Sequence, residues 1–216
     1  MNIQYKIFSK GCIDVLPLLI PVVPFGIIFG VIGIESGLGS TVTFLMSIII
    51  FAGSSQLAFA QLFTGGATTP VIVSSVAIVN SRHFLYSAVI AQYLTKLKLF
   101  WKIVLSYFLT DQAFIVSQKY FKQQPKNKDR HYHLLGSGFT LWFVWQLSTV
   151  AGIILGEVIP KELNLAFAVP LTFISLIIVD IKKIDQLIVA ITSGVFAIIF
   201  FRSEEHTSEL QSHVRI

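Results

Sequence analysis

Residues 71–94 read VIVSSVAIVNSRHFLYSAVIAQYL, an almost continuous apolar run with Asn80-Ser81-Arg82-His83 near its middle. A helix needs roughly 20 mostly apolar residues to cross the hydrocarbon core of a membrane, and this run is long enough. An arginine at the bilayer centre costs at least about 2.5–3.5 kcal/mol on insertion scales. We therefore expect a transmembrane segment in which Arg82 faces the bundle interior or water and has a partner.

The composition of the whole chain is that of a membrane protein. Of its 216 residues, 54% are hydrophobic and 12% are charged. Soluble domains carry about a quarter charged residues, so this chain is too apolar to cover a soluble surface. The basic residues lie between apolar runs, which argues against a nucleic-acid-binding face. Cys12 is the single cysteine, which excludes a disulfide framework.

The apolar runs predict an all-α polytopic membrane protein with about seven transmembrane helices, some of them broken or re-entrant. The first run is too long for a cleaved signal peptide and is expected to be a transmembrane segment. We expect the runs to form a single transmembrane domain over residues 1–201. The runs lie at 13–34, 41–63, 70–95, 99–118, 134–158, 163–180 and 184–201.

Residues 202–216 differ abruptly from the rest of the chain. The string RSEEHTSELQSH after Phe201 back-translates, codon by codon, into a widely used sequencing-adapter oligonucleotide. We therefore expect this segment to be a translated artefact that is not native, and the natural chain to continue past Phe201. The alternative is a short polar cytoplasmic tail.

Lysine and arginine in the short loops predict the orientation, because cytoplasmic loops carry an excess of them. The loop at 119–133 holds five such residues, and Lys6 and Lys10 place the N-terminus on the same, cytoplasmic side. The lysines of 96–102 lie one apparent crossing away and conflict with this assignment. Either that loop is an exception, or the 70–118 region contains a re-entrant or broken helix.

Prolines and glycines in the first segment predict a broken or kinked helix around Pro24-Phe25-Gly26. A helix N-terminus freed by such a break can face a substrate carboxylate. The alternative is that proline and glycine are simply frequent in transmembrane helices. We expect Pro24 and Gly26 to belong to a substrate site.

A possible internal repeat relates two distant parts of the chain. Gly26–Gly30 resembles Gly152–Gly156, and Thr43-Phe44 with Ser47 resembles Thr172-Phe173 with Ser175. Secondary transporters often contain such repeats and bind substrate at the repeat interface. Chance similarity of short glycine and isoleucine strings is the alternative.

Polar residues inside the apolar runs are the candidate site residues. Gln56 and Asn80 can contact a substrate or hydrogen-bond between helices. His83 suits proton transfer, because the pKa of an ordinary histidine is near 6.5, but a neutral structural histidine is equally consistent. Asp111 is an intramembrane carboxylate and the expected counter-ion of Arg82, with a purely structural ion pair as the alternative.

The sequence gives little sign of a metal, a cofactor or an enzyme. His131 and His133 lie in the basic loop, and two histidines alone are weak evidence for a metal. The sequence contains no Walker motif, nucleophile elbow or zinc-protease spacing. We expect no cofactor, no metal and no enzymatic activity.

Four stretches, taken together, resemble the AzlC family, the large subunits of branched-chain amino-acid exporters. They are Pro24-Phe25-Gly26 with Phe29-Gly30, FAGSSQ at 51–56, NSRHFLYS at 80–87 and LTDQAF at 109–114. The resemblance covers about residues 10–201. Family members often carry an acidic residue where Gln112 stands, so this chain lacks a second carboxylate there.

The resemblance implies a secondary transporter of the bacterial cytoplasmic membrane that exports valine, leucine or isoleucine. It also implies coupling to the proton motive force and a small AzlD-like membrane partner. An exporter of another small amino acid or zwitterion, an intramembrane enzyme using His83 and Asp111, and a non-transporting scaffold are the alternatives.

In the transport hypothesis the substrate carboxylate lies toward Arg82 or a broken-helix N-terminus, and Gln56 and Asn80 fix it. Protonation of Asp111 or His83 then couples the cycle.

Overall fold

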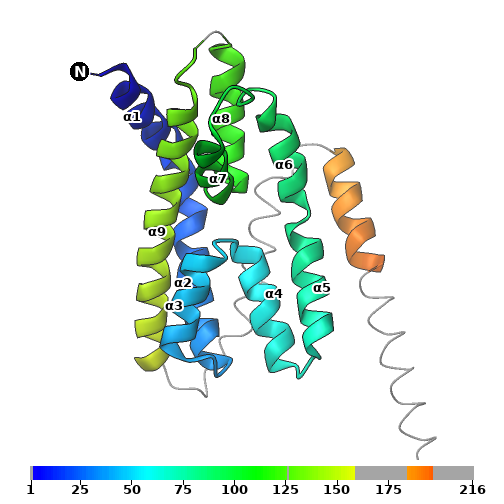
Figure 1. Cartoon of the computed structure of the whole chain (residues 1–216). Coiled ribbons are helices and arrows are strands. Elements are labelled where there is room, and N and C mark those ends of the chain that lie inside the picture. The colour runs from blue at the N-terminus through cyan, green and yellow to red at the C-terminus, as the bar shows by residue number, and fades with distance from the viewer. Residues whose placement is uncertain (1, 126, 159–183, 197–216) are drawn as a thin grey trace, which may run out of the picture. The chain divides into compact units, whose positions relative to one another are not determined.

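The computed structural model describes residues 2–125, 127–158 and 184–196, and within these ranges the regular structure is helical with no strands (Figure 1). Contacts divide the chain into two compact units, Met1–Val169 and Pro170–Ile216, and each is described by itself. In the second unit the described part is an apolar helix, Ile184–Phe196. The expected segment at 163–180 and the adapter-like tail lie outside the described residues, and the single domain over 1–201 stays a prediction.

Two long helical segments form the centre of the first unit. α1 (Ile3–Val15), the 3-10 turn η1 (Leu16–Leu18) and α2 (Leu19–Glu35) make one helical path, and α9 (His131–Val158) packs along it. Among the described residues, these two segments are the ones long and apolar enough to cross a membrane. The predicted count of seven crossings therefore stays a prediction.

Glycines allow α2 and α9 to pack closely in the same direction. A Cβ added to Gly152 would overlap the backbone of Ile27, and one added to Gly26 would lie 2.7 Å from the Cβ of Ser148. Small residues at such contacts are typical of helix pairs in membranes, where close packing replaces the hydrophobic effect. The strings Gly26–Gly30 and Gly152–Gly156 thus lie against each other, whereas 172–175 lies outside the described residues.

The helix break expected at Pro24 is wrong. α2 runs from Leu19 to Glu35 with Pro24 inside it. The change of helix type comes earlier, at η1, which has a proline in its first turn. Proline is well accommodated there, because the first amide groups of a helix have no intrahelical partner.

Two pairs of short helices turn back inside the bundle from opposite ends (Figure 1). They are α3 (Gly39–Ile49) with α4 (Gly53–Thr64), and α7 (Leu99–Tyr107) with α8 (Asp111–Gln123). The runs at 41–63 and 99–118, expected as single crossings, are thus each a pair of short helices that turns back on itself. A polar tip interrupts each run, but the mean hydropathy of the whole run does not reveal it.

Side-chain contacts define the path of the second hairpin along α9. Trp101, near the start of α7, lies 5.0 Å from the ring of His131, and Phe108, just after α7, lies against Gly138. α8 then returns, and the ring of Tyr120 stacks on His133 at 4.2 Å. The chain between 99 and 123 therefore enters and leaves at the same end of the bundle.

The tips of the two hairpins meet in the middle of the bundle. The hydroxyl of Tyr107 donates a hydrogen bond to the carbonyl of Ile48. The ring of Phe51 lies 5.9 Å from that of Tyr107. Phe51 adopts a φ of 42°, a left-handed conformation that is uncommon outside glycine and marks the sharp turn at this tip.

A third interrupted segment connects the two ends of the bundle. α5 (Thr69–Asn80) packs on α4, and α6 (Arg82–Ala91) packs on α8. The two helices follow each other with one interruption at Ser81 (Figure 1). The apolar run that includes Arg82 is thus a single path broken at its polar centre.

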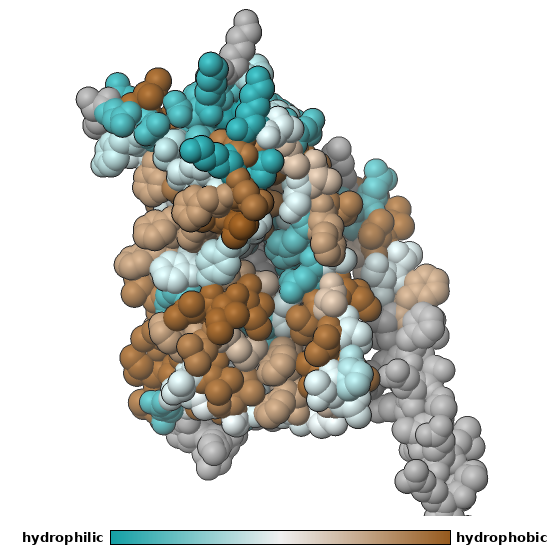
Figure 2. Space-filling view, in the orientation of Figure 1, coloured by the Kyte–Doolittle hydropathy of each residue, from teal (hydrophilic) through white to brown (hydrophobic). Residues whose placement is uncertain are grey.

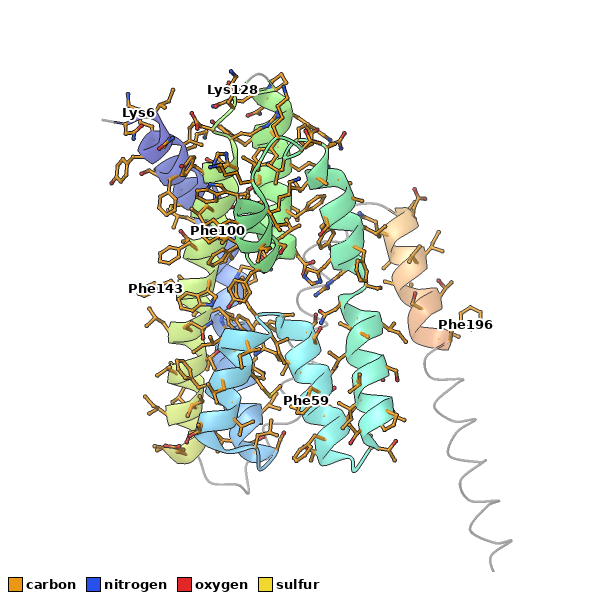
Figure 3. All side chains as sticks on the ribbon, viewed as in Figure 1. Lys6, Phe59, Phe100, Lys128, Phe143 and Phe196 are labelled. Atoms are coloured by element: carbon orange, nitrogen blue, oxygen red, sulfur yellow. The ribbon has the colours of Figure 1, made fainter. Side chains whose placement is uncertain are left out.

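The α7–α8 hairpin explains how the two basic loops at 96–102 and 119–133, which are one apparent crossing apart, can lie at the same end. Because this hairpin does not cross, the loops before and after it lie at the same end of the bundle, together with the start of α1 (Figure 1). Hydrophilic side chains gather at this end in Figure 2, and Figure 3 places Lys6 and Lys128 there. We call it the basic end.

Cysteine labelling tests this topology. In a Cys12→Ser background, Lys98→Cys and Lys128→Cys should react with a membrane-impermeant maleimide from the same side of the membrane, because a hairpin separates them. Thr68→Cys, in the turn between α4 and α5, should react from the opposite side. Labelling of the two lysine positions from opposite sides would show instead that residues 99–123 cross.

Bulk added between α2 and α9 should destabilise the bundle. Gly152→Leu places a side chain where the backbone of Ile27 lies, and overpacking of this kind costs typically about 1–3 kcal/mol. We expect a lower midpoint of thermal unfolding in detergent, followed by circular dichroism. Ala151→Leu, on the exposed face of the same helix, is the matched control. Equal midpoints for the two variants would contradict the close packing.

Candidate functional site

Three helices begin at one place inside the bundle. α4 begins at Gly53, α6 at Arg82 and α8 at Asp111, each directly after an interruption of the helical path. A helix start leaves backbone N–H groups without intrahelical acceptors and carries partial positive charge. No side-chain cap hydrogen bond is present at any of these three starts. Their amide groups are therefore suited to bind an anion.

Side chains at these starts are joined by short polar contacts. Nη2 of Arg82 lies 3.2 Å from Oδ2 of Asp111 and donates a hydrogen bond of 2.6 Å to Oγ of Ser54. Oγ of Ser55 donates to Oδ1 of Asn80 at 2.6 Å. The structure thus brings together Asn80 of α5, Arg82 of α6 and Asp111 of α8. Two serines of α4 join them.

The ion pair is open to small solutes. The side chain of Arg82 is 35% exposed and that of Asp111 is 33% exposed. A pair that is sealed in a dry core would serve packing alone, whereas this pair lines a surface that water or a solute can reach. Accessible intramembrane charges typically mark the path of a polar solute.

Several buried polar atoms close to the helix starts have no hydrogen-bond partner among the described residues. They are both amide atoms of Gln56, Nε of Arg82 and the hydroxyl of Thr110. Gln56 is fully buried in the first turn of α4. An unsatisfied buried polar group costs about 1–3 kcal/mol, so these atoms favour a polar solute or water that would pair with them.

An aromatic surface adjoins the start of α4. A Cβ added to Gly53 would lie 2.6 Å from the ring of Trp145 and 2.8 Å from that of Phe25. Tyr86 of α6 stacks on Phe114 of α8 at 4.5 Å. Charged and apolar groups therefore lie next to each other at this point of the bundle.

Pro24 and Gly26 do not join this cluster in the way that the sequence suggested. Gly26 packs on Ser148 and Trp145 of α9, and Pro24 is exposed within an unbroken α2. No helix begins at either residue to face a carboxylate. Phe25, between them, is the residue of this stretch that lies near the start of α4.

His83 lies beside Arg82 and is engaged locally. Its Nδ1 is 3.1 Å from the carbonyl of Asn80, and its ring meets that of Tyr86 edge to face at 5.7 Å. These contacts fit a structural histidine, and a role in proton coupling stays a prediction.

Sequence reasoning missed two parts of the polar structure. Ser54 and Ser55 belong to the FAGSSQ stretch but were not among the candidate site residues, although both lie just after the start of α4 and bond to neighbouring segments. His133 was expected in a loop, but it lies in the first turn of α9 and is fully buried. Its signal was Asp14, a second carboxylate inside an apolar run.

Within the described residues, no group of three or more histidine, cysteine, aspartate or glutamate side chains is arranged to hold a metal ion. The Arg82 cluster offers one carboxylate and a guanidinium, and a cation would be repelled by the latter.

Comparison with known proteins places this arrangement in a family. The AzlC protein family profile matches residues 17–159. The chain is 27% identical over 197 residues to an "Uncharacterized membrane protein" of Archaeoglobus fulgidus, covering 89% of this chain and 84% of that protein. It is 26% identical over 191 residues to the "Inner membrane protein YgaZ" of Escherichia coli, covering 84% of this chain and 76% of that protein.

No solved structure matches the chain. The family match spans α2, the three interrupted segments and α9, and the two relatives are named as membrane proteins. The chain therefore belongs to the AzlC family of membrane proteins.

Proposed function

We propose that the chain is the integral membrane subunit of a secondary transporter that exports valine, leucine and isoleucine across the bacterial cytoplasmic membrane. The observation that carries the proposal is the meeting of Arg82, Asp111 and three helix starts inside the bundle. Family membership supports a transport-related role, and the resemblance to branched-chain exporters supports the substrate class.

The charges of the site complement those of a free amino acid. The substrate carboxylate binds the guanidinium of Arg82 and the amide groups of the helix starts, while its ammonium group binds Asp111. A neutral zwitterion thus replaces one ion pair by two, and the net charge of the site does not change. This balance limits the cost of desolvating charge in the bundle, which an unpaired ion would raise by several kcal/mol.

The remaining groups fix the orientation and receive the side chain. The unpaired amide of Gln56 and the side chain of Asn80 offer hydrogen bonds to the polar half of the substrate. The rings of Phe25 and Trp145 offer an apolar surface for a branched aliphatic chain. Binding pockets for small molecules commonly combine a few polar groups with such an apolar lining.

The two hairpins can give the substrate access to the site from one end of the bundle at a time. Interrupted backbone at membrane depth is tolerated where it is buried in protein or lines a cavity, and transporters use such segments at their substrate sites. Tyr107 and Ile48 join the two tips. Movement of either hairpin away from this contact opens the site to one end while the other hairpin keeps the opposite end closed.

We place the basic end in the cytoplasm, because cytoplasmic loops carry the excess of lysine and arginine. Export then carries the substrate from the basic end to the opposite one. The proton motive force drives it, and a small AzlD-like membrane subunit completes the transporter. Both of these proposals rest on the family resemblance.

Export of another small zwitterion is the second candidate, because Arg82 and Asp111 recognise the groups that all amino acids share. An intramembrane enzyme is less favoured. Within the described residues His83 is bonded to the carbonyl of Asn80, and no hydrogen bond joins it to Asp111.

Counterflow of labelled isoleucine in proteoliposomes tests the site. Arg82→Ala should abolish counterflow, since loss of a hydrogen-bonded charged contact costs about 2–5 kcal/mol or more. Asp111→Asn should reduce it strongly, because the ammonium group of the substrate loses its partner. Lys128→Ala, an exposed loop variant, should behave as wild type.

Normal export by folded Asp111→Asn protein would remove the role of this carboxylate. Turnover of isoleucine without counterflow would point to the enzyme instead. Competition by unlabelled valine, leucine and other small zwitterions in the same assay then separates the two transport candidates.

Co-expression tests the partner. A short hydrophobic reading frame next to the gene should encode a membrane protein that co-purifies with this chain in mild detergent and raises isoleucine counterflow. A matched hydrophobic protein of similar length from elsewhere in the genome is the control. Full counterflow by this chain alone, with no increase on co-expression, would contradict the partner.

A further inference from the structure

A second polar network lies near the basic end, on residues that the Arg82 cluster does not use. Nζ of Lys10 lies 2.9 Å from Oδ1 of Asp14, and Oδ2 of Asp14 lies 3.0 Å from Nε2 of His133. Nδ1 of His133 is 3.2 Å from Oγ of Ser117, which is 3.2 Å from Oγ of Ser137. The network links α1, α8 and α9.

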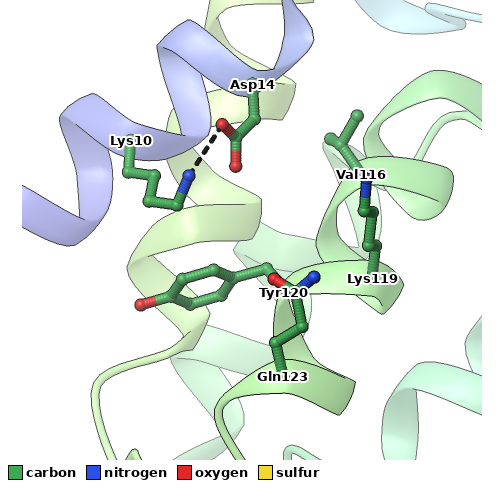
Figure 4. Close-up of a pocket in the computed structure, with 6 residues that line it drawn as sticks. All are labelled: Lys10, Asp14, Val116, Lys119, Tyr120 and Gln123. Carbon is green, nitrogen blue, oxygen red and sulfur yellow. Dashed lines mark hydrogen bonds and ion pairs between the residues drawn. The ribbon is translucent and has the colours of Figure 1, made fainter.

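One side of the network is buried and the other is exposed. His133, Ser117 and Ser137 are completely buried, whereas the side chain of Asp14 is 30% exposed. Asp14 opens into a cavity of about 240 Å³ (Figure 4). The cavity is lined by Lys10, Asp14, Val116, Lys119, Tyr120 and Gln123. The carboxylate therefore connects a cavity large enough for water with the imidazole of His133, which does not line the cavity.

The network can satisfy His133 in both of its protonation states. In the neutral ring, Nε2–H donates to Asp14 and Nδ1 accepts from the hydroxyl of Ser117. In the charged ring, Nδ1–H donates to Ser117, whose own hydroxyl turns to Ser137. The hydroxyl of Ser137 then donates to the carbonyl of Leu134, which lies 3.2 Å away. Neither state leaves a donor or acceptor of the buried network unpaired, so burial does not fix the ring in one protonation state through its hydrogen bonds.

The charges around His133 also permit both states. From α1 the facing groups are Asp14 and, behind it, Lys10, which balance each other; the thiol of Cys12 lies against Gly136 instead. From α8 they are Tyr120, stacked on the ring, and Lys119 at the cavity wall. A proton on His133 adds one positive charge in direct contact with a carboxylate.

The position of the network connects it to the substrate site. α8 begins at Asp111, which pairs with Arg82, and carries Ser117 and Tyr120 two turns further along. A change in the hydrogen bond between His133 and Ser117 therefore acts on the same short helix that holds the counter-ion. α8 also packs on α1, α6 and α9, so a movement of this helix is transmitted to its neighbours.

From this geometry we infer that His133, connected to water through Asp14, is the site that carries the transported proton. The inference rests on the proposed transport function and assigns its coupling step to residues outside the substrate site. In the tautomer whose Nδ1–H donates to Ser117, the lone pair of Nε2 accepts a proton that the Asp14 carboxylate has taken from the cavity, and the reverse path returns it there. In this conformation His133 therefore exchanges its proton with the basic end, and transport requires that the exchange with the opposite end takes place in the opposite-facing state. Asp111 then serves as the counter-ion and contact of the substrate.

Transport assays separate the proton site from the substrate site. In proteoliposomes, counterflow of labelled isoleucine needs no net proton movement, whereas accumulation against a gradient does. His133→Gln should keep counterflow and lose accumulation driven by an imposed pH gradient. Arg82→Ala should lose both. His131→Gln, at a buried histidine two residues earlier whose ring meets that of Trp101 edge to face, is the matched control and should keep both.

Asp14→Asn provides a second variant at a more exposed position, and it should also lose accumulation while keeping counterflow. Asp14→Asn tests the inference even if the His133→Gln protein does not fold. Accumulation at the wild-type level in a folded variant of either residue would overturn the inference, as would loss of both activities in folded Asp14→Asn.

A measurement without substrate distinguishes failure of the inference from failure of the proposed function. Nitrogen-15 NMR of imidazole-labelled full-length protein, with the His133 signal assigned by its loss in His133→Gln, reports protonation directly. The signal should change from charged to neutral between about pH 5 and 8, the range in which histidine commonly titrates. A ring that stays in one state over this range overturns the inference. A titrating ring in a protein with no counterflow of isoleucine contradicts the proposed function alone.

Discussion

The structure depends on one constraint, that backbone amide and carbonyl groups inside a membrane need partners within the protein. Three helical paths in the described part of the chain are interrupted inside the bundle, and the first amide groups of each new helix have no intrahelical acceptors. They are tolerable because the interruptions lie together and share Arg82, Asp111 and two serines. The ion pair and the broken backbone thus stabilise each other. An arginine alone in this position would be expensive, and so would a helix start facing lipid.

Around this centre the bundle combines a rigid part with movable parts. The long helical segments α1–α2 and α9 touch along their length through glycines, and this contact leaves little freedom for sliding. The two hairpins are short, and their tips are joined through Tyr107 and Ile48. In the proposed mechanism, substrate binding at the helix starts and proton binding at His133 both act on α8. Contact of one short helix with both proposed sites is a physical requirement for coupling them.

Much of the candidate site could be predicted from the sequence, but much of the path of the chain could not. Arg82 and Asp111 were recognisable because charges are costly in apolar runs, and the cost predicts that they pair. The hairpin at 99–123 was one of two alternatives that the sequence left open, because the basic loops on both sides of it conflict if the run crosses. Hydropathy could not choose between the alternatives, since the two arms together have the length and hydropathy of a crossing. The predicted helix break at Pro24 was wrong, because a proline inside a helix and a proline at a break cannot be told apart in the sequence. His133 was missed because helix boundaries are uncertain by several residues, and α9 begins earlier than its apolar run.

The entry of the two hairpins from opposite ends has a consequence for the states of the transporter. Residues 3–64 consist of a long path followed by a hairpin, and residues 69–123 repeat this order upside down. The two stretches therefore share one order of elements and run in opposite directions through the bundle. Secondary transporters commonly use inverted halves of this kind to reach their two opposite-facing states. For the proposed transporter, an exchange of the two arrangements would expose the Arg82 cluster to the other end of the bundle.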